Sequence, residues 1–132
     1  MEITIIPQLS DNFCYHVTHG TTSFIVDCSE AHKVESYLNG RQISHILTTH
    51  KHNDHSGGNL DLKQKFDVQV VGGLHDNIPG VTLPVEDKQV LQIGDIRITC
   101  LHTPCHTRGH ILYLCEVENE GIEDYSVEFG TY

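Results

Sequence analysis

Short apolar runs alternate with turn-forming residues along most of the chain, which is the pattern of a protein rich in short β-strands. Turn signals at Ser10-Asp11-Asn12 and Gly20-Thr21-Thr22 separate the first three runs. Gly94-Asp95 is a two-residue turn signal of the kind that joins hairpin strands. The predicted strands are Ile3–Ile6, Cys14–Thr18, Ser23–Val26, Ile43–Leu47, Val68–Val71, Gln89–Ile93, Ile96–Leu101 and His110–Cys115.

Two segments space their apolar residues as a helix does. Glu30–Asn39 is the first, and Gly40 follows it where a C-terminal cap belongs. Asn59–Phe66 is the second. Pro79-Gly80 and Pro84 instead predict an irregular surface stretch. The order of these elements favours a mixed α/β sheet with helices on one face.

Length and charge narrow the possible classes of protein. The chain has 132 residues, so residues 1–132 are predicted to form one domain rather than two. Its net charge of -10 argues against nucleic acid and anionic membranes as partners, because few cations could neutralise phosphates. The C-terminal tail, about 116–132, is predicted to be a solvated, loosely ordered edge. It holds the acidic residues Glu116, Glu118, Glu120, Glu123, Asp124 and Glu128.

The sequence also bears on location. Its N-terminal residues do not resemble a secretory signal, and no apolar run is long enough to span a bilayer. The five cysteines are an odd number without the spacing of a disulfide framework, which indicates reduced thiols. We therefore expect a cytoplasmic protein. The cysteines are Cys14, Cys28, Cys100, Cys105 and Cys115.

The strongest chemical signal is one short run, from His50 through His52 and Asp54 to His55. Histidine is the commonest metal ligand, and Zn²⁺ binds both imidazole nitrogen and carboxylate oxygen. His50 and His52 are two residues apart, so in an extended segment they point to the same side. Asp54 and His55 are expected in the turn that follows, ahead of the flexible Gly57-Gly58. The run predicts a metal site.

A second group of possible ligands lies downstream, in a loop that Pro104 and Gly109 indicate. One histidine there could complete a three-nitrogen site with His50 and His52, which leaves a position open for water, as in catalytic zinc sites. Cys105 is a rival ligand, although a lone cysteine more often behaves as a small buried apolar residue. The loop histidines are His102, His106 and His110; the scattered His16, His19, His32, His45 and His75 are interpreted as surface or structural residues.

These motifs resemble those of the metallo-β-lactamase superfamily, and within it those of glyoxalase II, the hydroxyacylglutathione hydrolases. The resemblance rests on the His50–His55 run with Ser56-Gly57-Gly58-Asn59 after it, and on Thr103-Pro104-Cys105-His106-Thr107. Ser10-Asp11-Asn12-Phe13 and Ile25-Val26-Asp27 add to it. The similarity covers essentially the whole chain but only the N-terminal half of a typical member. It implies a C-terminally truncated αββα sandwich.

By this resemblance, His50, His52 and His106 hold a first metal ion, and Asp54 and His55 begin the site of a second. Asp54 is also the candidate catalytic residue, and Asp27 supports the metal-binding loop from behind. The implied cofactor is Zn²⁺, with Fe or Mn as other options. The implied reaction is hydrolysis of S-(2-hydroxyacyl)glutathione, such as S-lactoylglutathione, to a 2-hydroxy acid and glutathione, by water that the metal activates. This is the chemistry of methylglyoxal detoxification.

The chain departs from the family pattern near its end. Members of the family carry Gly-Asp-Thr after the strand that follows His110, and its Asp bridges two ions, whereas here Gly130 and Thr131 are adjacent. Asp124 is a candidate substitute. With Asp54 and His55 as its remaining ligands, the second ion is expected to be weakly held or absent. An uncovered sheet face would also favour self-association.

Two alternatives remain open. A persulfide dioxygenase of the same superfamily would hold one iron ion and consume oxygen. A fragment or alternative transcript product would share the ancestry but have little activity. The residues that bind substrate are not predicted by the sequence.

Overall fold

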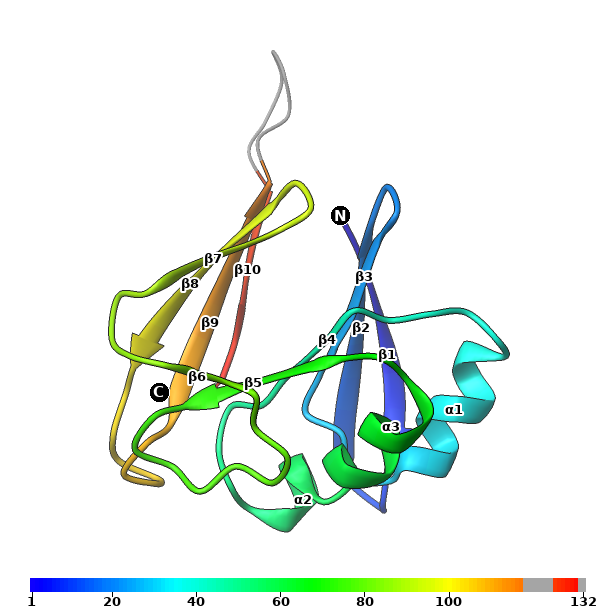
Figure 1. Ribbon diagram of the computed structural model, residues 1–132, viewed down its shortest axis with the longest axis horizontal. Helices are drawn as coiled ribbons and strands as arrows, with labels where there is room; N and C mark the ends of the chain where they lie inside the picture. The colour runs from blue at the N-terminus through cyan, green and yellow to red at the C-terminus, as the bar shows by residue number, and fades with distance from the viewer. Residues whose placement is uncertain (118–124, 131–132) are drawn as a thin grey trace.

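The computed structural model describes residues 1–117 and 125–130. Two β-sheets face each other across an apolar core, and helices lie on the outer side of the larger sheet (Figure 1). The described residues therefore form three layers, in the order helix, sheet, sheet. The predicted mixed α/β class is confirmed.

The larger sheet has six strands in the order β1-β2-β3-β4-β5-β6. The first three are antiparallel, whereas β3 to β6 run parallel. Parallel neighbours need a crossover connection, and helices provide it between β3 and β4 and between β4 and β5. The strands are β1 (Glu2–Gln8), β2 (Asn12–His19), β3 (Thr22–Val26), β4 (His45–Leu47), β5 (Gln69–Gly73) and β6 (Leu83–Val85).

Helices α1 (Ala31–Leu38) and α3 (Asn59–Lys65) cover the outer face of this sheet with apolar side chains. Their apolar residues recur at helical spacing, so one stripe faces the sheet. Helix α1 ends at Asn39, which is left-handed with a φ of 48°, one residue before the predicted cap at Gly40. The buried apolar residues of the two helices are Ala31, Val34, Leu38 and Leu62.

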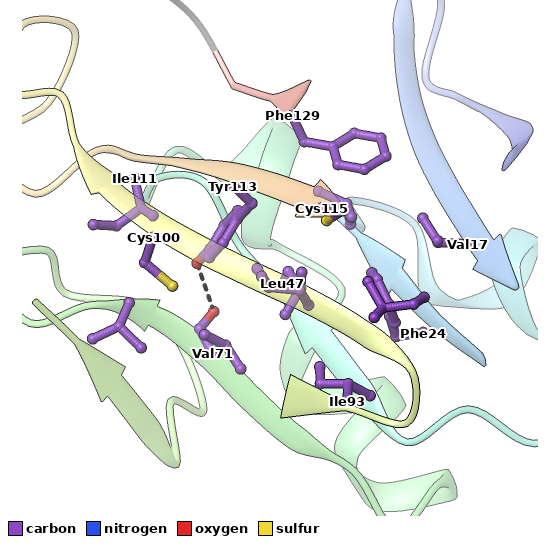
Figure 2. Packing of buried hydrophobic residues seen from close by; sticks show 14 of the residues in the cluster. Val17, Phe24, Leu47, Val71, Ile93, Cys100, Ile111, Tyr113, Cys115 and Phe129 are labelled. Carbon is purple, nitrogen blue, oxygen red and sulfur yellow. Dashed lines mark hydrogen bonds between the residues drawn. The ribbon is translucent and has the colours of Figure 1, made fainter. Parts of the chain in front are cut away.

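The smaller sheet has four antiparallel strands in the order β10-β9-β8-β7. It packs against the inner face of the larger sheet, and Figure 2 shows the side chains that meet between them. Because side chains alternate along a strand, a strand that borders this core directs every second side chain into it. The strands are β7 (Val90–Ile93), β8 (Ile96–His102), β9 (Ile111–Val117) and β10 (Tyr125–Phe129).

Tyr113 joins the two sheets at the centre of the core. Its ring is fully buried, and its hydroxyl donates a hydrogen bond of 2.8 Å to the carbonyl of Thr48. The hydroxyl also lies 3.4 Å from the carbonyl of Val71, the contact drawn in Figure 2. A buried aromatic side chain contributes about 1.5–3 kcal/mol through its apolar surface. Tyr113 thus ties the smaller sheet to the segment that leads into the histidine run.

Three local predictions were wrong. The predicted irregular stretch is found at Pro79-Gly80 but does not extend to Pro84, which lies in β6, where proline is tolerated because the strand is at the edge of the sheet. Asp54 and His55 lie in a short helix, α2 (Asn53–Ser56), and not in a turn. Part of the acidic tail is strand β10 rather than a loose edge, because Phe129 is buried and its ring lies 5.1 Å from that of Tyr15. Glu118, Glu120, Glu123, Asp124 and Thr131 lie outside the described residues.

One margin of the larger sheet remains uncovered. Ile3, Ile5 and Phe13 lie on its inner face at the β1–β2 edge and are 38%, 54% and 48% exposed. The smaller sheet therefore covers the middle of that face but not this edge. Self-association through the margin stays a prediction. Within the described part of the chain, no helix has the length and apolar character needed to cross a membrane.

Candidate metal centre

The histidine run and the downstream loop meet at one end of the molecule. The segment after β4 and helix α2, the loop after β5 and the loop after β8 lie together at the lower end of Figure 1. The strands β4 and β5 are parallel, so the segments that follow them leave the sheet at the same edge. The backbone N–H of Ile111 bonds to the carbonyl of Thr49 at 2.9 Å, which ties the β8–β9 segment to the run.

Three histidines converge at this end. One ring nitrogen from each of His50, His52 and His106 lies within 4.8 Å of the other two. His52 Nδ1 and His106 Nε2 lie 3.0 Å apart. His50 is buried, whereas His52 and His106 are exposed. The three nitrogens therefore form a site with a buried floor and an open side, into which a metal ion about 2.1 Å from each nitrogen could fit.

The buried nitrogen of His50 supports this interpretation. His50 Nε2 is buried and has no hydrogen-bond partner among the described residues, whereas its Nδ1 lies 2.9 Å from Thr49 Oγ1. A buried polar atom without a partner is costly, and a metal ion would satisfy it. Burial, and then the neighbouring His55, lower the pKa of His50 to about 4. The ring is therefore neutral near pH 7 and keeps the lone pair that a metal ligand needs.

Asp27 lies directly behind the run. Its carboxylate accepts hydrogen bonds from the Thr49 backbone N–H at 2.8 Å and the Thr49 hydroxyl at 2.7 Å. It also lies 2.8 Å from His55 Nδ1. Its backbone is left-handed, with a φ of 57°, which turns the chain sharply after β3. Asp27 thus contacts the run's backbone and one of its rings, and its support of a metal-binding loop stays a prediction.

The second pair of predicted ligands lies beside the first site. His55 Nε2 is 3.5 Å from Asp54 Oδ2, and Asn12 Nδ2 donates a 3.0 Å hydrogen bond to the same oxygen. The bond to Asp27 raises the pKa of His55 despite the opposing effect of partial burial. Partial burial raises the pKa of Asp54, but the Asn12 bond and His55 outweigh it, so the pKa is lowered. Asp54 is therefore ionised near neutral pH.

Ligand-competent atoms of Asp27, His50 and His55 also lie within 4.8 Å of one another, and this set includes Asp27 rather than Asp54. Both oxygens of Asp27 already accept from Thr49 or His55. Asp54 is the more exposed carboxylate, at 45% of its side chain against 8% for Asp27. The hydrogen-bond partners favour Asp54 and the outer nitrogen of His55 as ligands, with Asp27 as their support.

The three-nitrogen set includes neither the remaining described histidines nor the rival thiol. His110 is buried, its Nδ1 is 2.7 Å from Thr103 Oγ1, and its ring centroid is 5.3 Å from that of His50. Cys105 is exposed, contrary to the buried interpretation, and none of the candidate metal groups found among the described residues includes it. His16 is a buried structural residue bonded to Tyr37 and Ser23.

One buried carboxylate at the site was not predicted. Asp76 follows β5 and accepts hydrogen bonds from Lys51 N at 2.8 Å and from Thr107 Oγ1 at 3.0 Å. The available signal was its place just beyond the carboxyl end of a buried strand, which is also where Asp27 lies. Its partners are 25 and 31 residues away, so no local spacing pointed to them.

Comparison with known proteins identifies the family. Residues 9–122 match the metallo-β-lactamase superfamily model. The chain belongs to the metallo-β-lactamase superfamily. Among solved members, a subclass B3 enzyme of Bradyrhizobium japonicum superimposes with a TM-score of 0.83 at 21% identity, over 97% of this chain and 58% of that one. A β-lactamase from Chitinophaga pinensis gives a TM-score of 0.81 at 18% identity, with the same coverage. At such identity the likeness shows the metallo-β-lactamase fold alone.

Within the superfamily, the predicted resemblance to hydroxyacylglutathione hydrolases is confirmed by similarity to proteins of that name. The cytoplasmic hydroxyacylglutathione hydrolase of Arabidopsis thaliana is 42% identical over 119 residues, 86% of this chain and 46% of the relative. The hydroxyacylglutathione hydrolase of Pelagibacter ubique is 38% identical over 119 residues, 86% of this chain and 50% of the relative. The chain thus spans about half the length of these metallo-β-lactamase relatives.

Proposed function

We propose that this chain carries the metal site of a hydroxyacylglutathione hydrolase. The reaction is hydrolysis of S-(2-hydroxyacyl)glutathione: water adds to the thioester carbonyl, the C–S bond breaks, and a 2-hydroxy acid and glutathione leave. Two observations carry the proposal: one ring nitrogen from each of His50, His52 and His106 converges on a single space, and the buried His50 Nε2 has no hydrogen-bond partner among the described residues. The names of the relatives support the thioester substrate.

In this proposal His50, His52 and His106 hold one Zn²⁺ ion firmly, and Asp54 with His55 holds a second ion weakly. When bound, such an ion lowers the pKa of its water and polarises the thioester carbonyl. When the His55 ring is neutral, donation of Nδ1–H to Asp27 leaves Nε2 with its lone pair toward Asp54. Asp54 is ionised and partly exposed, so its carboxylate is placed to accept a proton from the attacking water or to bind the second ion.

The same proposal covers location and substrate. A cytoplasmic protein is supported by the name of the Arabidopsis relative and by five thiols that form no disulfide. Zinc is supported by an all-imidazole site with an open position, and imidazole is also a ligand that suits iron. The proposal names no glutathione-binding residue, since this chain covers about half the length of the relatives and the other half has no counterpart in it.

The test is metal content and thioester hydrolysis on the same sample. The purified 132-residue chain, loaded with zinc and desalted, is expected to retain about one ion per chain, and His50→Ala should abolish that retention. Hydrolysis of S-lactoylglutathione should require the retained ion. A chain that retains no metal would overturn the proposal. If the chain instead retains iron and consumes oxygen when given a persulfide, the proposed reaction is wrong and is that of a persulfide dioxygenase, whereas the proposed metal site stands.

A further inference from the structure

Asp76 links the two segments that supply the three converging histidines. Its side chain is buried, with 7% of the residue exposed, at the start of the loop after β5. One oxygen accepts from Lys51 N at 2.8 Å and from Thr107 Oγ1 at 3.0 Å. The other accepts from Gly109 N at 3.3 Å. One carboxylate therefore receives three donors from two loops that are distant in sequence.

These donors lie beside the metal ligands. Lys51 is the residue between His50 and His52, and Thr107 directly follows His106. We propose that Asp76 is a positioning residue that sets the distance between the His50–His52 segment and the His106 loop. The inference rests on the proposed metal site and adds to it the group that holds its two halves in register.

The chemistry of the contacts favours a carboxylate over any other side chain at this position. All three partners are donors, two backbone N–H groups and one hydroxyl, and a carboxylate offers acceptors only. An asparagine would present an NH₂ group to at least one of these donors, which leaves that donor without a partner in a buried place. Hydrogen bonds to a charged acceptor are also about twice as strong as neutral ones.

The backbone around Asp76 packs closely against the backbone of the His106 loop. A Cβ added at Gly109 would collide with the backbone of His75 and Asp76, and one added at Gly73 would collide with the carbonyl of Gly109. The loop after β5 and the His106 loop are therefore in direct backbone contact. Loss of the carboxylate would leave this packing in place but free Lys51 N and Thr107 from their shared anchor.

Asp76 and Asp27 hold the run from its two sides. Asp27 accepts from Thr49, the residue before His50, whereas Asp76 accepts from Lys51, the residue after it. Asp27 also contacts the ring of His55, so a change there alters a proposed ligand directly. The three hydrogen bonds of Asp76 go to backbone and to a hydroxyl, so its effect on a metal ion must act through the position of the loops.

The test compares zinc affinity with stability in Asp76→Asn. A matched control is Gln8→Ala, because Gln8 is also buried and also anchors loop N–H groups, those of Ser29 at 3.1 Å and Glu30 at 2.7 Å. Zinc affinity is measured by competition with a chromophoric chelator, and stability by urea unfolding in EDTA. Asp76→Asn is expected to weaken zinc binding about 10–100-fold, the range for loss of a group that supports metal ligands.

Gln8→Ala is expected to lower stability yet keep zinc affinity within about twofold, since its contacts lie outside the site. The Co²⁺-loaded protein adds a second readout, because a changed ligand distance alters its visible absorption spectrum. If Asp76→Asn fails to fold, Thr107→Val decides, since it removes one donor with little change of volume and should weaken zinc binding by a smaller factor. Unchanged zinc affinity and an unchanged Co²⁺ spectrum in a less stable folded variant would show a purely structural role. A native chain that binds no zinc would instead refute the proposed function.

Discussion

The hydroxyl of Thr49 connects Asp27 to His50, and its removal should weaken the proposed metal site without replacing any of the proposed ligands. Thr49 Oγ1 lies 2.7 Å from Asp27 Oδ2 and 2.9 Å from His50 Nδ1. A carboxylate only accepts, so the hydroxyl must donate to Asp27 and accept from His50 Nδ1–H. This arrangement fixes the proton of His50 on Nδ1 and leaves the lone pair on the buried Nε2. Thr49→Val keeps the shape of the side chain and removes both bonds.

The expected loss follows from the two bonds. A hydrogen bond to a charged group is worth about 1.5–3 kcal/mol and a neutral one about 0.5–1.5 kcal/mol. Thr49→Val should therefore destabilise the metal-free chain by about 2–4.5 kcal/mol. In the variant the imidazole has no partner to hold its proton on Nδ1. Zinc affinity should then fall about 10–100-fold, as for other groups that orient a metal-binding histidine.

Urea unfolding in EDTA measures the first effect and competition with a chelator the second. The ring ¹⁵N shifts of His50 in the metal-free protein report its tautomer directly. Thr49→Ser, which keeps the hydroxyl, should restore most of the zinc affinity and the Nδ1–H tautomer. Native-like zinc affinity in Thr49→Val, together with an unchanged His50 tautomer, would refute the assigned hydrogen-bond chain.

Three further predictions concern pH, the core and turnover. Burial lowers the pKa of His50 to about 4, so the neutral ring stabilises the metal-free fold above about pH 6.5 and this contribution is lost as pH falls toward 4. Urea unfolding in EDTA at pH 7.5 and at pH 5 measures the loss, and the stability of His50→Ala should vary less between the two pH values. Tyr113→Phe, which removes the bond to Thr48, should cost about 1 kcal/mol in unfolding free energy and leave zinc affinity unchanged; a loss of affinity would mean that the core and the site are coupled. The 132-residue chain assayed alone should hydrolyse S-lactoylglutathione at below about a hundredth of the rate of a relative assayed at full length, with little preference over a simple lactoyl thioester. Loss of one electrostatic contact, here the bridging Asp of the family pattern, is commonly worth about 10²–10³ in rate, and loss of binding to the remote glutathione moiety lowers kcat. Full family rates with a clear preference for the glutathione thioester would contradict this prediction.

Most strands and both longer helices were predictable because their signals are local. Alternation along β2 and β8 and the apolar stripe of α1 record which face each residue turns to the core. Strand β6 and the strand within the acidic tail were missed for the opposite reason. Pro84 and Glu128 argue against a strand locally, yet β6 is held by its pairing with β5 and β10 by its pairing with β9.

The same division applies to the candidate site. His50, His52, Asp54 and His55 lie within six residues, so their spacing alone predicts a metal site, and His106 was added to it through the resemblance of its loop. No local sequence pattern predicts the roles of Asp76 and the Thr49 hydroxyl or the tautomer of His50. Their roles depend on hydrogen bonds between residues 22 to 33 positions apart, and these contacts exist once the parallel strands bring their carboxyl ends together. The sequence therefore determines which metal-competent side chains stand close together along the chain, whereas the folded backbone determines where their nitrogen and oxygen atoms lie relative to one another.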